Sequence, residues 1–386
     1  MEIFTSYKVR LYPNQDQRIY LNKTFGCCRF LWNQMLHERK SVYQQLKDNK
    51  EQYYAYKYKT EKEYKEIYPF LKEVDSIALQ QTRKHLVEAY ITFRKSCSSN
   101  RKVGLPRFKS KRNKQSFTTT ITRNNIKIDF TEKKIKIPKL KTPILYSDDR
   151  TFNEPIRSVT VSKTKSGKYY ASILVKKDIE VIEKTVIASD KIIAFDMSFP
   201  NFLVSENYIG ENPRFYKNAY NSLKRLHRRH SRTKLKSRNR EKMRIRLARK
   251  YESFVNKKTD WMHKFTRTLA NEYDAIILEN LNIEGMKKFN KGYAKTVTLD
   301  FSWFEFTTVL EYKLKYKGGK LIKVDRFFPS SKMCSKCGHI YKELRIDERE
   351  WTCKKCNSIL HRDINASINL KQEGLKILQN NGITVP

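Results

Sequence analysis

The stretch CSKC (334–337), CKKC (353–356) and HRDINASINL (361–370) places two cysteine pairs directly before an acidic residue. Each Cys-x-x-Cys pair can direct two thiolates at one metal ion, and fifteen residues separate the pairs. Four thiolates leave no coordination position open, so the expected ion is a structural Zn²⁺. The predicted zinc ligands are Cys334, Cys337, Cys353 and Cys356.

The composition indicates a nucleic-acid partner. The chain has 386 residues, enough for two or three domains, and 81 Lys and Arg against 40 Asp and Glu, a formal net charge of +41. That much like charge repels itself unless a polyanion neutralises it. No segment approaches the ~18 apolar residues of a membrane span, and the N-terminus lacks a signal-peptide layout. We therefore expect a cytoplasmic protein, acting at the nucleoid, that binds no membrane and keeps its seven cysteines reduced.

The N-terminal half changes its periodicity twice. SYKVRLYPN (6–14) alternates like a strand and ends in a turn signal. Apolar residues then recur at helical spacing from Gln15 to about Lys47, and again over 76–96. From 104 to 177 alternation with β-branched residues returns, which predicts a β-rich module into which the early helices are inserted.

The C-terminal half has an α/β layout. Apolar runs closed by an acid predict buried strands at KIIAFD (191–196), DAIILEN (274–280) and KLIKVD (320–325). NFLVSE (201–206) is expected to form a hairpin with the first of these. We place a domain boundary near 185–190.

Helices are predicted between these strands. The first is a very basic helical stretch over 217–258, and the next is a separate amphipathic helix that begins at Trp261. The third, over 301–318, ends in a Gly-Gly stop.

Three acids could form a catalytic centre. Asp196 and Glu279 each end an apolar strand, and Asp363 opens a predicted helix. Carboxylates at the ends of neighbouring strands can converge on one sheet edge, where they repel one another unless cations hold them. Two Mg²⁺ or Mn²⁺ ions about 3.5–4 Å apart would do so, and would support hydrolysis of a phosphodiester. A single acid ending a strand is more often a cap or a salt-bridge partner; three in this order, in so basic a chain, favour catalysis.

Four longer segments give these features a family resemblance. They are KIIAFDMSFPNFLV (191–204), DWMHKFTRTLANEYDAIILENLNIEGM (260–286), FFPSSKMCSKCG (327–338) and WTCKKCNSILHRDINASINL (351–370). The chain resembles the TnpB family of transposon-encoded RNA-guided DNA endonucleases, which are related to the type V CRISPR effectors. In that family a zinc ribbon stands immediately before the third catalytic acid, as the two cysteine pairs do here.

The resemblance implies a fold and a domain plan. The fold class is α/β, with a RuvC/RNase H-like nuclease domain at 189–332 and 357–386 and a zinc ribbon inserted at 333–356. A β-barrel-like WED module is expected at 1–15 and 101–188, with a helical recognition domain at 16–100 inserted in it.

The resemblance also implies partners and roles. Asp196, Glu279 and Asp363 would hold two catalytic Mg²⁺ or Mn²⁺ ions. A guide RNA from the transposon end would pair with one strand of target double-stranded DNA beside a short motif, in a ribonucleoprotein with one protein chain.

One departure from the family pattern concerns the first acid. The family's commonest motif is Asp-aliphatic-Gly-aliphatic-Lys, whereas this chain has Asp196-Met197-Ser198-Phe199-Pro200. Loss of the glycine could alter how closely the backbone approaches the metal ions, and so the rate. Two alternatives stay open beside the endonuclease: a nuclease-silent nucleic-acid-binding regulator of transposition, against which the three retained acids argue, and a strand-transferring transposase, whose chemistry a RuvC-like fold also resembles.

Nucleic-acid contacts are expected in both halves. Fourteen Lys and Arg against the single Glu241 lie between Leu223 and Lys250, too many to be only a solvated helix face. Tyrosines in YYAYKYK (53–59) either stack on bases or are ordinary half-exposed side chains. The candidate phosphate contacts are Arg107, Lys109, Arg238, Arg240, Arg244 and Arg246, and the candidates for reading DNA bases are Gln80, Thr122 and Asn124.

Overall fold

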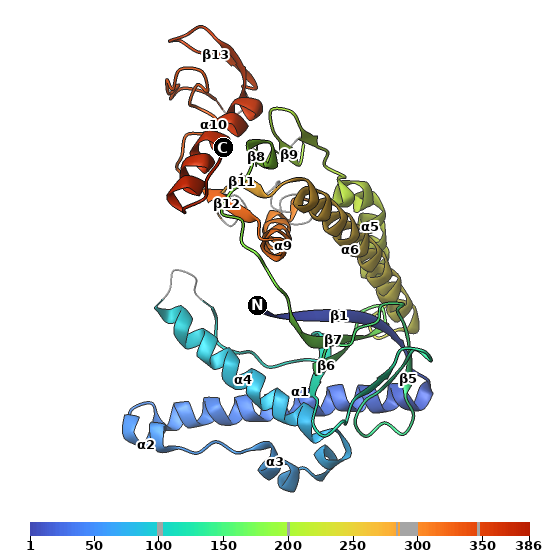
Figure 1. The fold of residues 1–386 in the computed structure, drawn as a ribbon. Helices are drawn as coiled ribbons and strands as arrows, with labels where there is room; N and C mark the ends of the chain where they lie inside the picture. The colour runs from blue at the N-terminus through green and yellow to red at the C-terminus, as the bar shows by residue number, and fades with distance from the viewer. Residues whose placement is uncertain (99–102, 199–200, 283–284, 286–299, 346–347) are drawn as a thin grey trace. The chain divides into compact units, whose positions relative to one another are not determined.

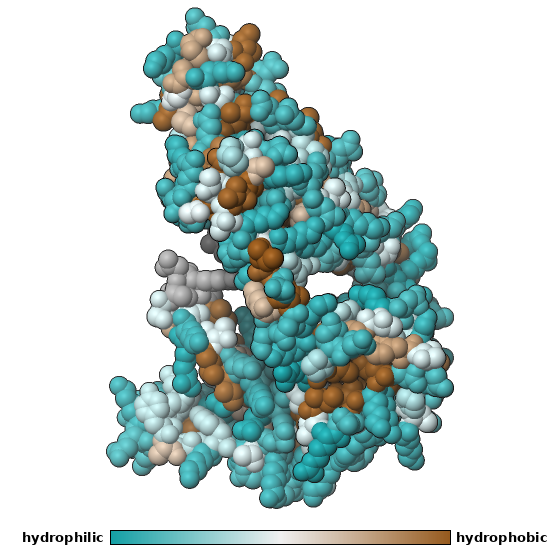
Figure 2. All heavy atoms as spheres, viewed as in Figure 1, coloured by the Kyte–Doolittle hydropathy of each residue, from teal (hydrophilic) through white to brown (hydrophobic). Residues whose placement is uncertain are grey.

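The chain forms a mixed α/β fold in a computed structural model that describes residues 1–98, 103–198, 201–282, 285, 300–345 and 348–386. Two compact units divide it: an N-terminal unit, Glu2–Asp178, and a C-terminal unit, Ile179–Pro386 with Met1 (Figure 1). Figure 2 shows a mostly hydrophilic face with separate apolar patches. Within the described residues, no helix is both long and apolar enough to cross a membrane.

The N-terminal unit contains a seven-stranded antiparallel sheet in the order β2-β6-β7-β1-β5-β4-β3. Alternate residues of its long strands are buried, as the sequence pattern predicted. No pairing between the end strands β2 and β3 appears among the described residues, so a closed barrel stays a prediction. The strands are β1 (Glu2–Tyr12), β2 (Gln115–Thr120), β3 (Lys127–Asp129), β4 (Lys134–Lys136), β5 (Ile144–Ser147), β6 (Ile156–Lys163) and β7 (Tyr169–Asp178).

Two long helices share the hydrophobic core of this sheet. Both were predicted from their periodicity: α1 (Gln15–Leu46) and α4 (Ser76–Cys97). Asn14 and Gln17 form a capping box that satisfies free N–H groups at the start of α1. Asp75 caps α4 through Ile77 N and accepts a 2.6 Å hydrogen bond from the Thr119 hydroxyl, which fixes the start of this helix to the end of β2.

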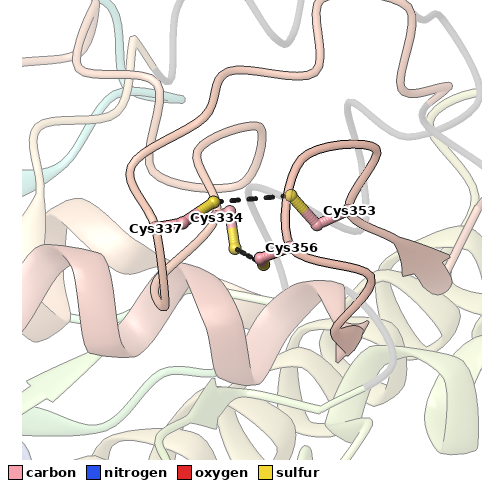
Figure 3. Close-up of side chains that lie close together, drawn as sticks. All are labelled: Cys334, Cys337, Cys353 and Cys356. Carbon is pink, nitrogen blue, oxygen red and sulfur yellow. Dashed lines mark hydrogen bonds between the residues drawn. The ribbon is translucent and has the colours of Figure 1, made fainter.

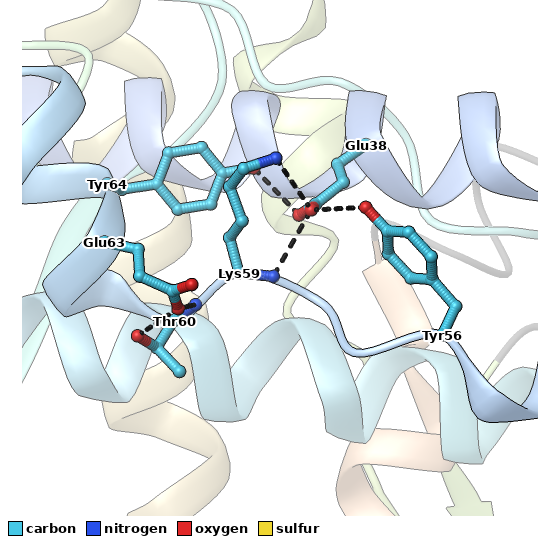
Figure 4. Close-up of polar contacts among 6 residues, drawn as sticks. All are labelled: Glu38, Tyr56, Lys59, Thr60, Glu63 and Tyr64. Atoms are coloured by element: carbon cyan, nitrogen blue, oxygen red, sulfur yellow. Dashed lines mark hydrogen bonds and ion pairs between the residues drawn. The ribbon is translucent and has the colours of Figure 1, made fainter.

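A buried carboxylate fastens the segment between α1 and α4. Glu38 of α1 accepts hydrogen bonds from the hydroxyls of Tyr56 (3.2 Å) and Tyr64 (2.9 Å) and from the Lys59 backbone (Figure 4). Tyr56 of the tyrosine-rich run is therefore a structural side chain, whereas Tyr54 in the same run is 79% exposed. The short elements of this segment are α2 (Lys50–Ala55), α3 (Glu61–Ile67) and η1 (Pro69–Glu73).

The C-terminal unit is built on a three-stranded parallel sheet in the order β12-β11-β8. Its strands are β8 (Ile192–Phe195), β11 (Ala275–Glu279) and β12 (Lys320–Val324), which confirms the three predicted apolar strands. The unit also contains η2 (Ser189–Lys191), β9 (Leu203–Val204), β10 (Ile209–Gly210), α5 (Phe215–Arg232), α6 (Arg238–Glu272), α9 (Trp303–Tyr316), β13 (Glu350–Thr352), β14 (Ile359–His361) and α10 (Arg362–Asn380).

Side chains of this sheet alternate between two helical layers. Ala194 and Ile277 share a buried cluster with Leu370 of α10. Phe195 and Leu278, the next residue along each strand, instead join a cluster with residues of α6 and α9. The sheet therefore has α10 on one face and α6 and α9 on the other, a two-sided burial typical of parallel strands (Figure 1).

The expected hairpin after β8 is confirmed only in part. Asp196 and Val204 exchange two backbone hydrogen bonds, of 2.8 and 2.9 Å, as an isolated antiparallel bridge. The ladder of β9, however, is formed with β10, where Val204 pairs with Ile209.

The predicted boundary between the basic helix and the amphipathic helix is wrong. Helix α6 runs without a break through residues 258–261, and the break lies instead between α5 and α6. There Ser237 caps α6, and the Arg240 guanidinium donates to the carbonyls of His230 and Thr233 at the end of α5. These contacts satisfy helix-end groups. Because the charge pattern runs through the break unchanged, it could not reveal a turn stabilised by a contact between two helices.

Close packing of α10 on β11 predicts a strongly position-dependent effect of Gly→Ala substitutions. A Cβ at Gly374 would meet three side-chain atoms of Ile277 at 2.4–2.6 Å, and Ile277 is fully buried in the central strand. Gly374→Ala is therefore expected to destabilise the C-terminal unit by about 1–3 kcal/mol. The measurement is the midpoint of urea unfolding followed by tryptophan fluorescence.

Gly26→Ala is the matched control, since Gly26 also lies inside a helix but has nothing within 4 Å of an added Cβ. There the higher helix propensity of alanine should stabilise by up to about 1 kcal/mol. Equal unfolding midpoints for the two variants would contradict the tight contact between α10 and β11.

Candidate metal centres

The four paired cysteines form one compact cluster. Their sulfur atoms all lie within 4.8 Å of one another, with Cys334 Sγ 3.6 Å from Cys356 Sγ and Cys337 Sγ 3.6 Å from Cys353 Sγ (Figure 3). All four are free thiols. Hydrogen bonding with Ser358 lowers the pKa of Cys356 to about 6, which favours the thiolate, the form that binds metals, whereas burial raises the pKa of Cys334. The cluster can therefore hold a metal ion.

Two asparagines of α10 fasten the first cysteine pair to the helix. Asn365 accepts a hydrogen bond from Ser335 N (2.9 Å) and donates to the Met333 carbonyl (2.7 Å). Asn369, one turn later, donates to the carbonyls of Met333 (2.6 Å) and Ser330 (2.8 Å). Both asparagine side chains are buried, so their amides replace water as partners of the loop backbone. The cysteine cluster is thus held against the helix that carries Asp363.

The three predicted acids lie on one side of the parallel sheet. Phe195 pairs with Leu278 in the register of β8 and β11, so Asp196 and Glu279 are the next residues at the carboxyl ends of the strands. Alternation places these two acids on the face that packs against α10. Asp363 lies in the first turn of α10. Strand register and helix packing therefore bring together residues that are far apart in the sequence.

Burial and mutual repulsion characterise this acidic centre. Burial, and then the charges of Asp363 and Glu279, raise the pKa of Asp196 to about 7. Burial also raises the pKa of Glu279. Asp363 is only 5% exposed. Carboxylates in this setting need cations to keep their charges, and their oxygen atoms are the ligands that Mg²⁺ and Mn²⁺ prefer.

Asp363 is held by a side chain at each carboxylate oxygen. Arg349 Nη1 lies 2.7 Å from Oδ1, and the Ser198 hydroxyl donates to Oδ2 at 2.8 Å. Ser198 stands where the family's commonest motif has glycine. Phe199 and Pro200, the last residues of that departure, lie outside the described residues.

The two candidate centres differ in compactness. In the described part of the chain, the cysteines are the group of three or more potential ligand residues whose donor atoms all lie within 4.8 Å of one another. The carboxylates of Asp196, Glu279 and Asp363 lie on one face of the sheet, and the charges of Asp363 and Glu279 act on Asp196. Their oxygen atoms, however, do not all lie within 4.8 Å of one another.

The candidate phosphate contacts of the C-terminal unit lie on a helical hairpin. We call residues 224–250 of α5 and α6 the basic hairpin; the two helices pack side by side, with His227 Nε2 2.8 Å from the Tyr251 hydroxyl (Figure 1). Arg238 and Arg246 are exposed on it. Arg244 is also exposed and pairs with Glu241 at 2.6 Å. Arg240 is half-buried, and its guanidinium donates hydrogen bonds to carbonyls at the end of α5, so it has a structural role.

The remaining nucleic-acid candidates lie in the N-terminal unit. Gln80 is exposed on α4, and Thr122 and Asn124 are exposed on the turn after β2, near the point where Asp75 and Thr119 join these two elements. Arg107 is exposed, and its carbonyl accepts a hydrogen bond from the Trp32 indole. The Lys109 ammonium lies 3.5 Å from the Trp32 ring centroid. Gln80, Thr122 and Asn124 thus belong to the start of α4 and the end of β2, whereas Arg107 and Lys109 lie beside Trp32 of α1.

Four site residues were missed by sequence reasoning: Ser198, Arg349, Asn365 and Asn369. The asparagines were visible as a pair at i and i+4 on one helix face. Nothing in the sequence indicated what they would face. Ser198 was noticed only as a missing glycine, and Arg349 is one of many arginines.

Three family models match this chain. A model described as "Probable transposase" matches residues 172–290, a "Cas12f1-like, TNB domain" matches 303–370, and a "Helix-turn-helix domain" matches 1–48. The first and third of these are models of the OrfB protein of IS605 elements. Residues 1–48 form strand β1 and the single helix α1 here, not two helices joined by a turn.

Curated relatives match nearly the whole chain. "Putative RNA-guided DNA endonuclease" of Streptomyces pristinaespiralis is 29% identical over 97% of this chain and 90% of the relative. "Putative RNA-guided DNA endonuclease InsQ" of Escherichia coli (strain K12) is 25% identical over 98% of this chain and 94% of the relative.

A solved structure has a similar fold. The protein in the cryo-EM structure of a Cas12f1–sgRNA–target DNA complex superposes with a TM-score of 0.54 at 16% identity, covering 96% of this chain and 99% of that one. At this identity the likeness concerns the fold. The family models and the full-length relatives agree: the chain is similar to the OrfB proteins of IS605-type elements and to proteins named RNA-guided DNA endonucleases, in line with the expected resemblance to the TnpB family.

Proposed function

We propose that this protein is an RNA-guided DNA endonuclease encoded by a transposon. The observation that carries the proposal is the convergence of Asp196, Glu279 and Asp363 on one face of a parallel sheet in a chain of net charge +41. The names of its full-length relatives and of its structural neighbour support the same activity. The substrate is target double-stranded DNA, selected by a guide RNA from the transposon end and recognised beside a short motif.

The acidic centre is a RuvC-like site in this proposal. Asp196, Glu279 and Asp363 hold two Mg²⁺ or Mn²⁺ ions, which activate water and stabilise the leaving oxygen when bound. The protein's own contribution is orientation. Parallel register aligns Asp196 with Glu279, and the Ser198 hydroxyl fixes Oδ2 of Asp363. Apolar packing on both faces of the sheet holds the strand ends that carry Asp196 and Glu279 in place.

The cysteine cluster is a structural zinc site in this proposal. Four sulfurs at about 2.3 Å from a tetrahedral ion lie about 3.8 Å apart, close to the two measured separations of 3.6 Å. The domain plan in this proposal is the one that the family resemblance implies. It has a nuclease domain at 189–332 and 357–386, with the zinc ribbon at 333–356. The WED-like module is 1–15 and 101–188, and the helical recognition domain is 16–100.

Nucleic-acid binding is divided between the units in this proposal. The basic hairpin neutralises RNA or heteroduplex phosphates, because its cations greatly outnumber its one acid, Glu241. The exposed amides and hydroxyl of Gln80, Thr122 and Asn124 are suited to base edges of the DNA motif, with Arg107 and Lys109 at the adjacent backbone.

Cys353→Ser is expected to remove the zinc. The folded wild-type protein should contain one Zn²⁺ per chain, and loss of one thiolate should both lower zinc content and destabilise the region that leads into Asp363. Elemental analysis of freshly purified protein measures this. Cys97→Ser is the control, because Cys97 is exposed at the end of α4 and lies outside the cluster. Wild-type protein that is folded but free of zinc would rule the assignment out.

Neutralising the basic hairpin should reduce the salt dependence of RNA binding. Arg238, Lys242 and Arg246 are exposed, and their combined replacement by Gln removes three candidate phosphate contacts. At a slope of roughly −0.7 per contacted phosphate, the plot of log K against log salt should become less steep by roughly 2. The control replaces Lys127, Lys136 and Lys141, which lie outside the hairpin. If both triple variants change the slope equally, the basic hairpin is not the RNA site.

Each acid of the centre should be indispensable for cleavage. Asp196→Ala, Glu279→Ala and Asp363→Ala should each lower the cutting rate by at least about 10²-fold, almost as much as the triple variant, because the carboxylates act as one unit. Guide and target binding should persist. The assay is guide-loaded, Mg²⁺-dependent cleavage of duplex DNA, with Asp260→Ala as the control, since Asp260 is an exposed acid paired with Lys264.

The same assay separates the alternatives. Wild-type cutting speed in Asp196→Ala would refute the RuvC-like assignment. A wild-type protein that binds guide and target yet never cuts would be the nuclease-silent regulator, with the Ser198-Phe199-Pro200 departure as the first suspect. Products with a joined transposon end would indicate a strand-transferring transposase.

A further inference from the structure

The ion pair between Arg349 and Asp363 connects the cysteine ribbon to the acidic centre. Arg349 lies between the two cysteine pairs, and its guanidinium reaches Oδ1 of Asp363 at 2.7 Å. The Asp363 side chain is only 7% exposed, so water screens the pair weakly on the carboxylate side. Ser198 occupies the other oxygen at 2.8 Å. One oxygen of Asp363 therefore accepts from a neutral hydroxyl, and the other is paired with a positively charged guanidinium.

The ribbon's own fold sets the position of Arg349. The Arg349 carbonyl accepts a 2.7 Å hydrogen bond from Arg362 N at the start of α10. The next residue, Glu350, begins strand β13 and pairs with His361 of β14. Cys353 follows β13 directly. The guanidinium is therefore held by a short hairpin that ends in one of the four clustered thiols.

The positive charge of Arg349 opposes a second cation at Asp363. A divalent ion that takes an oxygen of this carboxylate is repelled by a guanidinium hydrogen-bonded to the same group. The Arg349 side chain is 46% exposed, so water screens part of this repulsion, while the buried carboxylate limits that screening. Arg362 also influences the centre: it lowers the pKa of Asp196, but its guanidinium donates to the Arg345 carbonyl. Of these two arginines, Arg349 has the direct contact with a carboxylate oxygen.

We propose that the zinc ribbon sets the divalent-cation affinity of the acidic centre through Arg349. The inference rests on the proposed function in one respect, that the three acids bind Mg²⁺ or Mn²⁺. Arg349 is a positioning residue that supplies a competing charge, and its presence at Asp363 depends on the folded ribbon. By thermodynamic linkage, an ion in the ribbon and an ion at the acids then weaken one another. The ribbon thus regulates metal loading in addition to its structural role.

The test is Mn²⁺ binding, measured by electron paramagnetic resonance of the free ion, on the full-length protein without guide or DNA. Arg349→Gln removes the charge but keeps hydrogen-bond donors, and it should bind Mn²⁺ on the order of 5- to 10-fold more tightly than wild type. Arg349→Lys keeps the charge and should bind like wild type. Ser198→Ala removes a neutral donor from the same carboxylate and should show no gain in affinity. The part of the Mn²⁺ binding that disappears in Asp196→Ala is the part due to the acidic centre.

Two further variants separate charge from ribbon folding. Lys354→Gln makes the same charge change within the ribbon, at a lysine paired with Glu343, and should leave Mn²⁺ affinity unchanged. Cys353→Ser should raise Mn²⁺ affinity as Arg349→Gln does, and the two changes together should gain no more than either alone.

The outcomes distinguish this inference from the proposed function. Equal Mn²⁺ affinity in wild type, Arg349→Gln and Arg349→Lys would overturn the inference and leave the nuclease assignment intact. Equal gains for Arg349→Gln and Lys354→Gln would overturn it as well, since general charge would then explain both. If the wild-type protein shows no Mn²⁺ binding that disappears in Asp196→Ala, both the metal centre and the inference are overturned.

Discussion

The contact between helix α10 and the parallel sheet β12-β11-β8 is the constraint on which both candidate metal centres depend. Gly374 lets the helix approach Ile277 more closely than any side chain at that position would allow. That approach brings the first turn of α10, with Asp363, beside the carboxyl ends of β8 and β11. The same helix holds the first cysteine pair through Asn365 and Asn369. One helix therefore positions an acid for one ion site and the scaffold of another.

Electrostatics divides the C-terminal unit into two regions of opposite character. The basic hairpin concentrates positive charge on exposed helix surface, where a polyanion can reach it. The acidic centre instead concentrates carboxylates in a partly buried place, where desolvation and then their mutual repulsion raise the pKa of Asp196. Cations relieve that cost. Arg349 relieves part of it from within the chain, which makes the ribbon an electrostatic neighbour of the acids as well as a structural one.

Comparison of particular elements shows where sequence reasoning worked. Helices α1 and α4 and strand β11 were predicted because a long period-3.6 pattern, or a compact apolar run, reflects burial on one or both sides of an element. The break between α5 and α6 was misplaced because it depends on Arg240 reaching across to His230 and Thr233. The partner of β8 was only half right because β9 pairs chiefly with β10. In each miss the deciding contact lies outside the segment's own pattern.

By itself the sequence determined the chemistry available to this protein: thiolates at zinc spacing, acids closing apolar strands, and a strong positive charge. These properties are local or compositional, so they can be recognised without coordinates. Only the tertiary structure decided which groups meet. Ser198 and Asp363 are 165 residues apart, and their 2.8 Å hydrogen bond exists because strand register and helix packing place them on one face of the sheet. The same holds for Arg349, because a single arginine among many acquires a role only from the carboxylate it reaches.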